Sequence, residues 1–220
     1  MSKVNELLDE SIAADGFEIH SRADGRAIID LTRIDFDALA KRFKQSNRKN
    51  VDLEQLKAAI RAQLDKLIRI NKTRADYLSK FEELIDSYNA GSRNIEELFE
   101  ELLTFSRALT TEEQRHVREQ LTEDELTVFD VLTRPGPDLA GEEHDAVKKV
   151  ARQLLERLKS FLAPDWRQKA QGRAQVRIAI EDVLDEGLPR AYTPELYKQK
   201  CSALFEHVFE TFGTANSLVA

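Results

Sequence analysis

The sequence contains very little cysteine, glycine and proline, and each shortage excludes a class of protein. Its 220 residues include one cysteine, five prolines and eight glycines. The single cysteine, Cys201, excludes an internal disulfide framework and favours a reducing compartment. Scarce glycine and proline disfavour a sheet-rich fold with many tight turns. A soluble, helix-rich protein is therefore expected, as one large domain or two small ones.

Long apolar runs are also missing. None approaches the roughly 18 residues that a membrane helix needs, and the first ten residues, MSKVNELLDE, are too polar for a signal peptide. We therefore expect a cytoplasmic protein that has no contact with a membrane. The net charge of −7 argues against strong nucleic-acid binding by the whole surface but leaves room for a local basic patch.

Helical periodicity dominates from about residue 36 onward. Helix starts are predicted at Asn94, Thr110 and Thr122, because each precedes a glutamate by three positions. Gly91 is predicted to end a helix. The last helix, expected from Thr193 to about residue 212, has core-like positions at Leu196, Leu204, Val208 and Phe209. The pattern predicts an all-α, irregular bundle of seven or eight helices.

Strand character is confined to GFEIH (16–20) and RAIIDL (26–31), which predict a short extended or hairpin arm near the N-terminus. We expect residues 1–35 to form this arm and residues 36–215 to form the helical domain. RPGPD (134–138) breaks the helical pattern and is a candidate boundary between two subdomains.

Common catalytic motifs are missing from the sequence. It contains no phosphate-binding loop, no dinucleotide-binding G-x-G-x-x-G and no G-x-S-x-G elbow. Its four histidines and one cysteine are not spaced as zinc ligands. Glu113-x-x-His116 is one half of a di-iron pattern that needs two such pairs. We therefore expect no catalytic, cofactor-binding or metal-binding residues.

Two basic stretches are candidates for contact with DNA phosphates. KRFKQSNRK (41–49) has five cations and no acid, and DWRQKAQGRAQVR (165–177) has four cations and one acid. The candidate phosphate ligands are Lys41, Arg42, Lys44, Arg48, Lys49, Arg167 and Lys169. The alternative for the first stretch is a solvated helix end, where cations suit the helix dipole.

The second stretch contains the only tryptophan, Trp166. On a helix with about 100° per residue that begins near Pro164, Arg173 and Arg177 fall inside or at the edge of the apolar stripe. Cations in such positions need partners. Carboxylates of this chain, such as those in residues 96–102, are one interpretation. The other is a partner surface, with Trp166 as an amphipathic anchor.

Three segments resemble the C-terminal helical region of the R subunit of type I restriction endonucleases: residues 81–105, 121–133 and 163–189. The most specific part is the Asp-Trp of the third segment, followed by spaced arginines and then Gly-Leu-Pro. The resemblance covers roughly residues 36 to 210. It implies that residues 1–35 correspond to the link from upstream helicase domains, and that the chain is a fragment of a longer subunit.

In this family the R subunit drives ATP-dependent DNA translocation and cleaves DNA. The resemblance implies that the C-terminal region joins this motor to the complex of methyltransferase and specificity subunits. ATP and magnesium are then expected only in the missing upstream domains, with no cofactor in this fragment. DNA is expected as a partner of the full complex, with weak or no binding by the fragment. Two hypotheses therefore compete: a non-catalytic assembly module and a DNA-contacting helical module.

Overall fold

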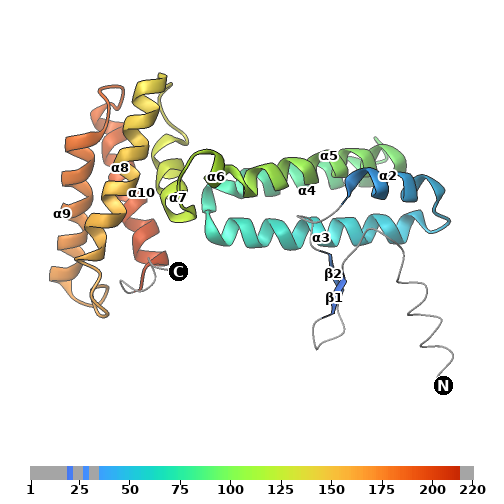
Figure 1. The fold of residues 1–220 in the computed structure, drawn as a ribbon, viewed down its shortest axis with the longest axis horizontal. Helices are drawn as coiled ribbons and strands as arrows, with labels where there is room; N and C mark the ends of the chain where they lie inside the picture. The colour runs from blue at the N-terminus through green and yellow to red at the C-terminus, as the bar shows by residue number, and fades with distance from the viewer. Residues whose placement is uncertain (1–18, 22–26, 30–34, 214–220) are drawn as a thin grey trace. The chain divides into compact units, whose positions relative to one another are not determined.

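A computed structural model describes residues 19–21, 27–29 and 35–213 (Figure 1). Within these residues the chain forms nine α-helices, one 3-10 helix and two short strands. The all-α prediction is confirmed. The helices outnumber the expected seven or eight because a one-turn helix, α6 (Arg115–Arg118), follows α5 in a charged run where the apolar pattern gives no sign of a separate element.

The strands lie in the predicted arm. β1 (Ile19–Ser21) pairs with β2 (Ala27–Ile29) in antiparallel register, with His20 opposite Ile28. The rest of residues 1–34 lies outside the described residues.

The chain divides into two compact units. Unit 1 comprises residues 1–69 and 74–114, and unit 2 comprises residues 70–73 and 115–220. The division falls at residues 114–115, whereas RPGPD (134–138) lies inside unit 2. Buried Lys200 helps to hold that segment, because its Nζ donates hydrogen bonds to the carbonyls of Val131 at 2.7 Å and Pro135 at 2.6 Å. Burial lowers the pKa of Lys200.

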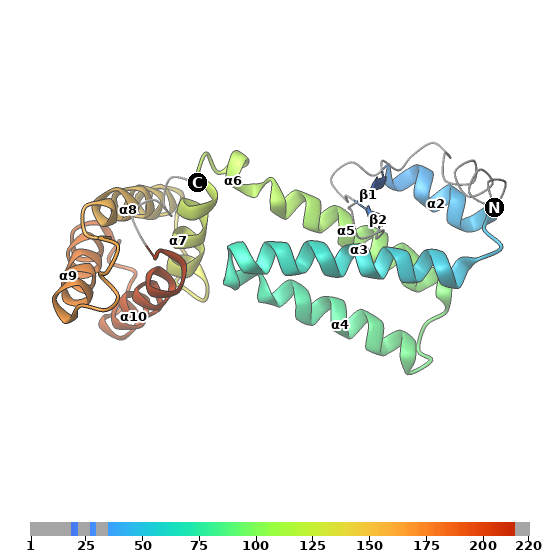
Figure 2. The same ribbon diagram turned by 90° about the horizontal axis from the view of Figure 1, so that it is seen from below.

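Unit 1 contains four helices: α2 (Phe36–Gln45), α3 (Lys49–Ile70), α4 (Ala75–Asn89) and α5 (Ile95–Glu113). Figures 1 and 2 show α3, α4 and α5 running alongside one another. Phe43 of α2 stacks on Phe99 of α5 with ring centroids 3.5 Å apart. A buried ion pair joins Arg74 Nε to Glu112 Oε1 at 3.1 Å. An apolar interior and one paired internal charge therefore hold this unit together.

Two of the three predicted helix starts are confirmed. Asn94 and Thr122 each form a capping box with the glutamate three positions later. The start predicted at Thr110 is wrong, since this residue lies inside α5 and its hydroxyl donates to Ser106 O at 3.1 Å. The apolar stripe of α5 continues through this point, so burial overrides the local capping signal. Gly91 follows the end of α4 with a φ of 75°, as predicted for a helix stop.

Unit 2 contains α6 and four longer helices: α7 (Glu123–Thr133), α8 (Gly141–Lys159), α9 (Ala170–Gly187) and α10 (Pro194–Thr211). Figure 2 shows α7, α8, α9 and α10 arranged around a common interior. Its core includes Leu126, Leu154, Ile180, Leu204 and Trp166. None of the described helices combines the length and the apolar character needed to cross a membrane.

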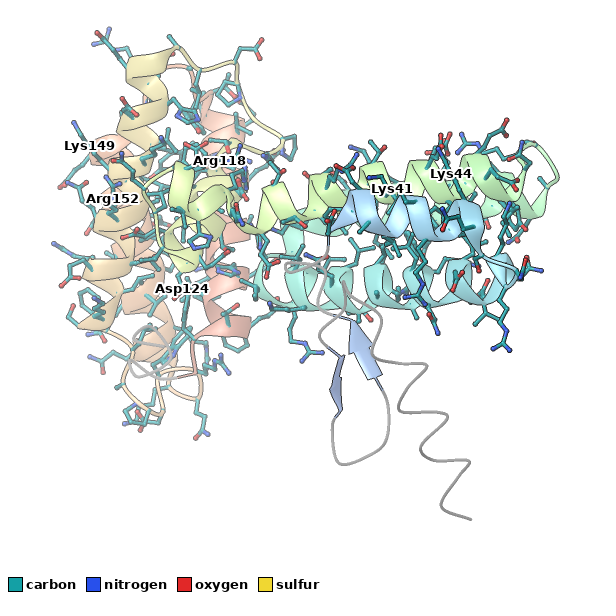
Figure 3. The ribbon with its side chains drawn as sticks, turned by 45° about the vertical axis from the view of Figure 1, so that its right-hand side comes forward. Lys41, Lys44, Arg118, Asp124, Lys149 and Arg152 are labelled. Atoms are coloured by element: carbon teal, nitrogen blue, oxygen red, sulfur yellow. The ribbon has the colours of Figure 1, made fainter. Side chains whose placement is uncertain are left out.

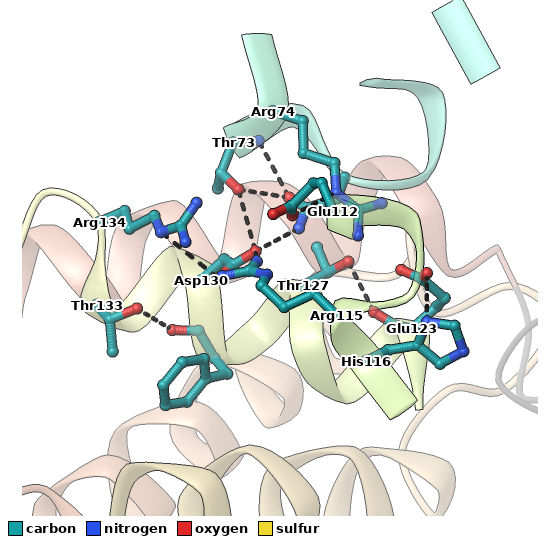
Figure 4. A network of polar contacts seen from close by, with 12 residues as sticks. Thr73, Arg74, Glu112, Arg115, His116, Glu123, Thr127, Asp130, Thr133 and Arg134 are labelled. Atoms are coloured by element: carbon teal, nitrogen blue, oxygen red, sulfur yellow. Dashed lines mark hydrogen bonds and ion pairs between the residues drawn. The ribbon is translucent and has the colours of Figure 1, made fainter. Parts of the chain in front are cut away.

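Asp130 of α7 is the centre of a buried polar network in unit 2 (Figure 4). Its Oδ2 accepts a hydrogen bond from Asn71 Nδ2 at 2.7 Å and forms an ion pair with Arg115. The guanidinium of Arg134 lies 3.8 Å from Oδ1. The network gives the fully buried carboxylate its compensating charge, and through Asn71 it ties residues 70–73 to unit 2.

Candidate functional site

Trp166 lies in a turn, residues 164–168, between α8 and α9. The expectation that a helix begins near Pro164 is wrong, because α9 begins at Ala170. Trp166 is 1% exposed, and its Nε1 donates to Phe212 O at 3.0 Å. Its backbone is approached closely by Gly172, where an added Cβ would lie 2.7 Å from Trp166 O. The tryptophan therefore anchors the turn in the core of unit 2 and offers no ring face to a partner.

Arg173 is half-buried and stabilises the same turn. Its Nη1 donates to Arg167 O at 2.7 Å and to Gln168 O at 3.1 Å. Backbone carbonyls, rather than carboxylates, are therefore the partners that the described residues give to Arg173. Its half-buried position agrees with the predicted place at the edge of the apolar stripe of α9.

Arg177 is exposed, which contradicts its expected place at the edge of the buried stripe. Its guanidinium lies over the Phe205 ring at 4.3 Å from the centroid. Arg167 lies over the Phe209 ring at 5.6 Å in a similar arrangement. The two phenylalanines are four residues apart on α10, with ring centroids separated by 6.1 Å. We call Arg167, Arg177, Phe205 and Phe209 the Arg–Phe face of unit 2.

The Arg–Phe face presents both apolar area and charge. Phe209 is 37% exposed, although its spacing predicts a core position. The Phe209 ring also contacts the Trp166 ring edge-to-face, with centroids 5.7 Å apart. This contact fixes the orientation of the Phe209 ring from the side of the core. A guanidinium held over an aromatic ring keeps its N–H groups in its own plane, where they can donate to a carboxylate. Arginine and phenylalanine are enriched in protein interfaces, which makes this face a candidate docking surface.

The first basic stretch lies at the end of α2 and the start of α3. Lys41 and Lys44 are exposed on α2, where Figure 3 labels them. Lys44 Nζ lies 3.6 Å from Glu100 Oε1, and Lys49 Nζ lies 2.7 Å from Glu96 Oε1. The ion pair with Lys49 holds the pKa of Glu96 below its usual range. Carboxylates of the same unit therefore already engage part of the positive charge.

The remaining cations of the two basic stretches differ in their availability. Lys41 and Arg48 are exposed and form no ion pair within the described part of the chain. Arg42 and Arg48 line a shallow polar hollow of about 410 Å³ beside Asp52. In the other stretch, Lys169 pairs with Asp165. The structure thus brings Arg42 and Arg48 together, whereas the other candidate phosphate ligands do not line this hollow.

The residues considered for metal or thiol chemistry have other partners. Within the described residues, no three or more His, Cys, Asp or Glu side chains gather as metal ligands. Glu113 Oε1 lies 2.8 Å from Lys66 Nζ, and His116 Nδ1 lies 3.0 Å from Glu123 Oε1. Burial raises the pKa of the Cys201 thiol. A raised pKa keeps the Cys201 thiol protonated, and the thiol is a weaker nucleophile than the thiolate.

The described residues therefore define an all-α protein of two helical units, one of which exposes an interface-like Arg–Phe face. The chain belongs to the family described as "Type I restriction enzyme HindI endonuclease subunit-like, C-terminal", whose model matches residues 1–212. The Type I restriction enzyme HindI endonuclease subunit of Haemophilus influenzae is 23% identical over 146 residues, which are 65% of this chain and 14% of that protein. No solved structure matches the chain. The expected relationship to a type I restriction enzyme subunit is confirmed.

Proposed function

We propose that this chain is a helical assembly module, which joins the DNA-translocating and DNA-cleaving motor of a type I restriction enzyme to its methyltransferase–specificity complex. Membership of a C-terminal family of the endonuclease subunit supports the setting. The observation that carries the role is the Arg–Phe face, where Arg177 lies 4.3 Å from the Phe205 centroid and Phe209 is 37% exposed.

The fixed side chains of the Arg–Phe face suit binding to a folded protein partner. The two guanidiniums are held in place by aromatic rings, so little side-chain entropy remains to be lost on binding. A carboxylate on the partner would pair with Arg177 while its apolar neighbours cover Phe209. ATP hydrolysis and DNA cleavage are assigned in this proposal to the rest of the longer subunit.

Co-elution tests the proposal. The 220-residue chain is mixed with the purified methyltransferase–specificity complex and separated by size at low and high salt. Co-elution at both salt concentrations supports the assembly role, because apolar contacts persist when charges are screened. Separate elution at both concentrations contradicts it.

A second candidate function is contact with DNA phosphates. It is favoured by Lys41 and Arg48, which are exposed and form no ion pair within the described ranges. Fluorescence anisotropy with a labelled duplex tests it. DNA contact requires binding that weakens steeply with salt and is lost in the Lys41→Glu, Arg48→Glu double variant. If the chain binds no duplex at low salt, this candidate is excluded.

A further inference from the structure

The negative charge of the chain is concentrated on two neighbouring helices of unit 1. α4 and α5 together carry ten carboxylates and two cations. Their net charge of −8 exceeds the −7 of the whole chain, so the remaining residues are together close to neutral. Glu112 is buried against Arg74, and the other nine carboxylates give the two helices an acidic surface that attracts cations and repels phosphate.

An apolar groove lies on this acidic surface. This shallow groove has a volume of about 620 Å³, and its apolar lining residues, which we call its floor, are Leu84 of α4 together with Phe105 and Ala108 of α5. The Phe105 ring is fixed by neighbouring rings, 6.3 Å from Tyr77 and 6.0 Å from Phe81 between centroids. The floor is therefore preorganised and needs no rearrangement to receive an apolar side chain.

Three glutamates of α5 line the same groove: Glu97, Glu100 and Glu101. Contacts within unit 1 orient these side chains. Glu97 Oε2 accepts from Asn94 N at 3.1 Å, and Glu101 forms an ion pair with Arg93. Glu100 reaches Lys44 only at 3.6 Å, and both of these side chains remain largely exposed. The carboxylates thus lie at one end of the groove and keep oxygen atoms available to further cations.

The lining residues of α5 recur at three- and four-residue spacing from Glu97 to Ala108. This stripe is about 16 Å long, at 1.5 Å per residue, and matches roughly three turns of a second helix. We infer that the groove binds a basic amphipathic helix of a partner protein, with apolar side chains on Leu84 and Phe105 and lysine or arginine against the glutamates.

Other occupants fit the groove less well. Nucleic acid is repelled by the glutamates that line it. A second copy of this chain would offer its basic stretch, residues 41–49, but the one aromatic of that stretch, Phe43, is 3% exposed and stacked on Phe99. The groove lies in unit 1 and the Arg–Phe face in unit 2, so this inference does not depend on the proposed docking through the Arg–Phe face.

A pair of matched substitutions tests the inference on the 220-residue chain. The probe is a fluorescent synthetic helix of about 18 residues, with leucine on one face and lysine on the other. Ala108→Arg places a cation in the groove. Ala62→Arg adds the same charge at an exposed alanine of α3 that lines neither this groove nor the hollow between α3 and α4. Circular dichroism verifies that both variants are folded, and Thr104→Arg, at an exposed position in the groove, replaces Ala108→Arg if that variant is not.

Anisotropy titrations separate the outcomes. The groove predicts that the lysine helix binds, that Ala108→Arg weakens binding about tenfold or more, and that Ala62→Arg stays within about twofold of the unsubstituted chain. Equal weakening by both variants would mean general charge attraction and would overturn the inference. Absence of binding by the lysine helix at low salt would also overturn it. Equal binding of a helix with glutamate in place of lysine would contradict the role of the glutamates.

Discussion

Replacement of Trp166 by phenylalanine should destabilise unit 2 by about 2–4 kcal/mol. The substitution removes the Nε1–H donor that lies 3.0 Å from Phe212 O. A buried carbonyl left without its donor costs about 1–3 kcal/mol. The smaller ring also leaves a cavity of about 40 Å³, which adds about 1 kcal/mol at roughly 24 cal/mol per Å³. Because the site is 1% exposed, water cannot readily replace the lost contacts.

Urea unfolding followed by circular dichroism measures this loss, since the variant has no tryptophan to report by fluorescence. Tyr197→Phe is the matched control in unit 2. It also removes a hydrogen bond to a backbone carbonyl, Tyr197 Oη to Glu181 O at 2.9 Å, but at a more exposed position. We expect the control to cost less than about 1 kcal/mol. A loss below about 1 kcal/mol for Trp166→Phe would refute the role of this residue as an anchor.

Three further predictions concern substitutions in unit 2. Asp130→Asn removes the buried carboxylate of the ion pair between Asp130 and Arg115 and should lower the free energy of unfolding by about 3 kcal/mol, measured by urea titration of Trp166 fluorescence. Burial lowers the pKa of His207 from 6.5 to about 4; Glu210 has a smaller effect that raises this pKa, and Lys72 has a smaller effect that lowers it further. As the pH falls, His207 therefore binds a proton at a higher pH in the unfolded chain than in the folded chain. Stability should decrease from about pH 6.5 to pH 4, by at most about 3 kcal/mol, and His207→Gln should remove this part of the pH dependence. Gly172→Ala would bring a Cβ within 2.7 Å of Trp166 O and should destabilise by about 1–3 kcal/mol, detected as a lower urea midpoint.

Local capping and periodicity predict much of the fold. The helix starts at Asn94 and Thr122 and the stop at Gly91 depend on hydrogen bonds and backbone angles within a few residues, so the sequence alone shows them. The division at residues 114–115 was not predictable in this way. It falls in the charged run EEQRHVRE, which contains no glycine or proline.

The candidate site depends on tertiary contacts, and periodicity does not reveal them. The turn at residues 164–168 is fixed by the contact of Trp166 with Phe212, 46 positions later. A helix wheel also does not show that Arg177 lies over Phe205 of α10. Phe209 lies one position after buried Val208, at the edge of the core, where Arg167 and Trp166 cover part of its ring and leave it 37% exposed. Sequence reasoning identified the arginines but missed the phenylalanines with which they form the face.

The most direct test of the assembly role is the affinity of single-charge variants for the methyltransferase–specificity complex, measured by titration calorimetry. Arg177→Glu reverses a charge on the Arg–Phe face, and Arg190→Glu reverses one at an exposed position in the loop between α9 and α10. The proposal predicts that Arg177→Glu raises the Kd at least about tenfold, whereas Arg190→Glu changes it by less than about twofold. Equal affinities for Arg177→Glu and the unsubstituted chain would contradict docking through this face.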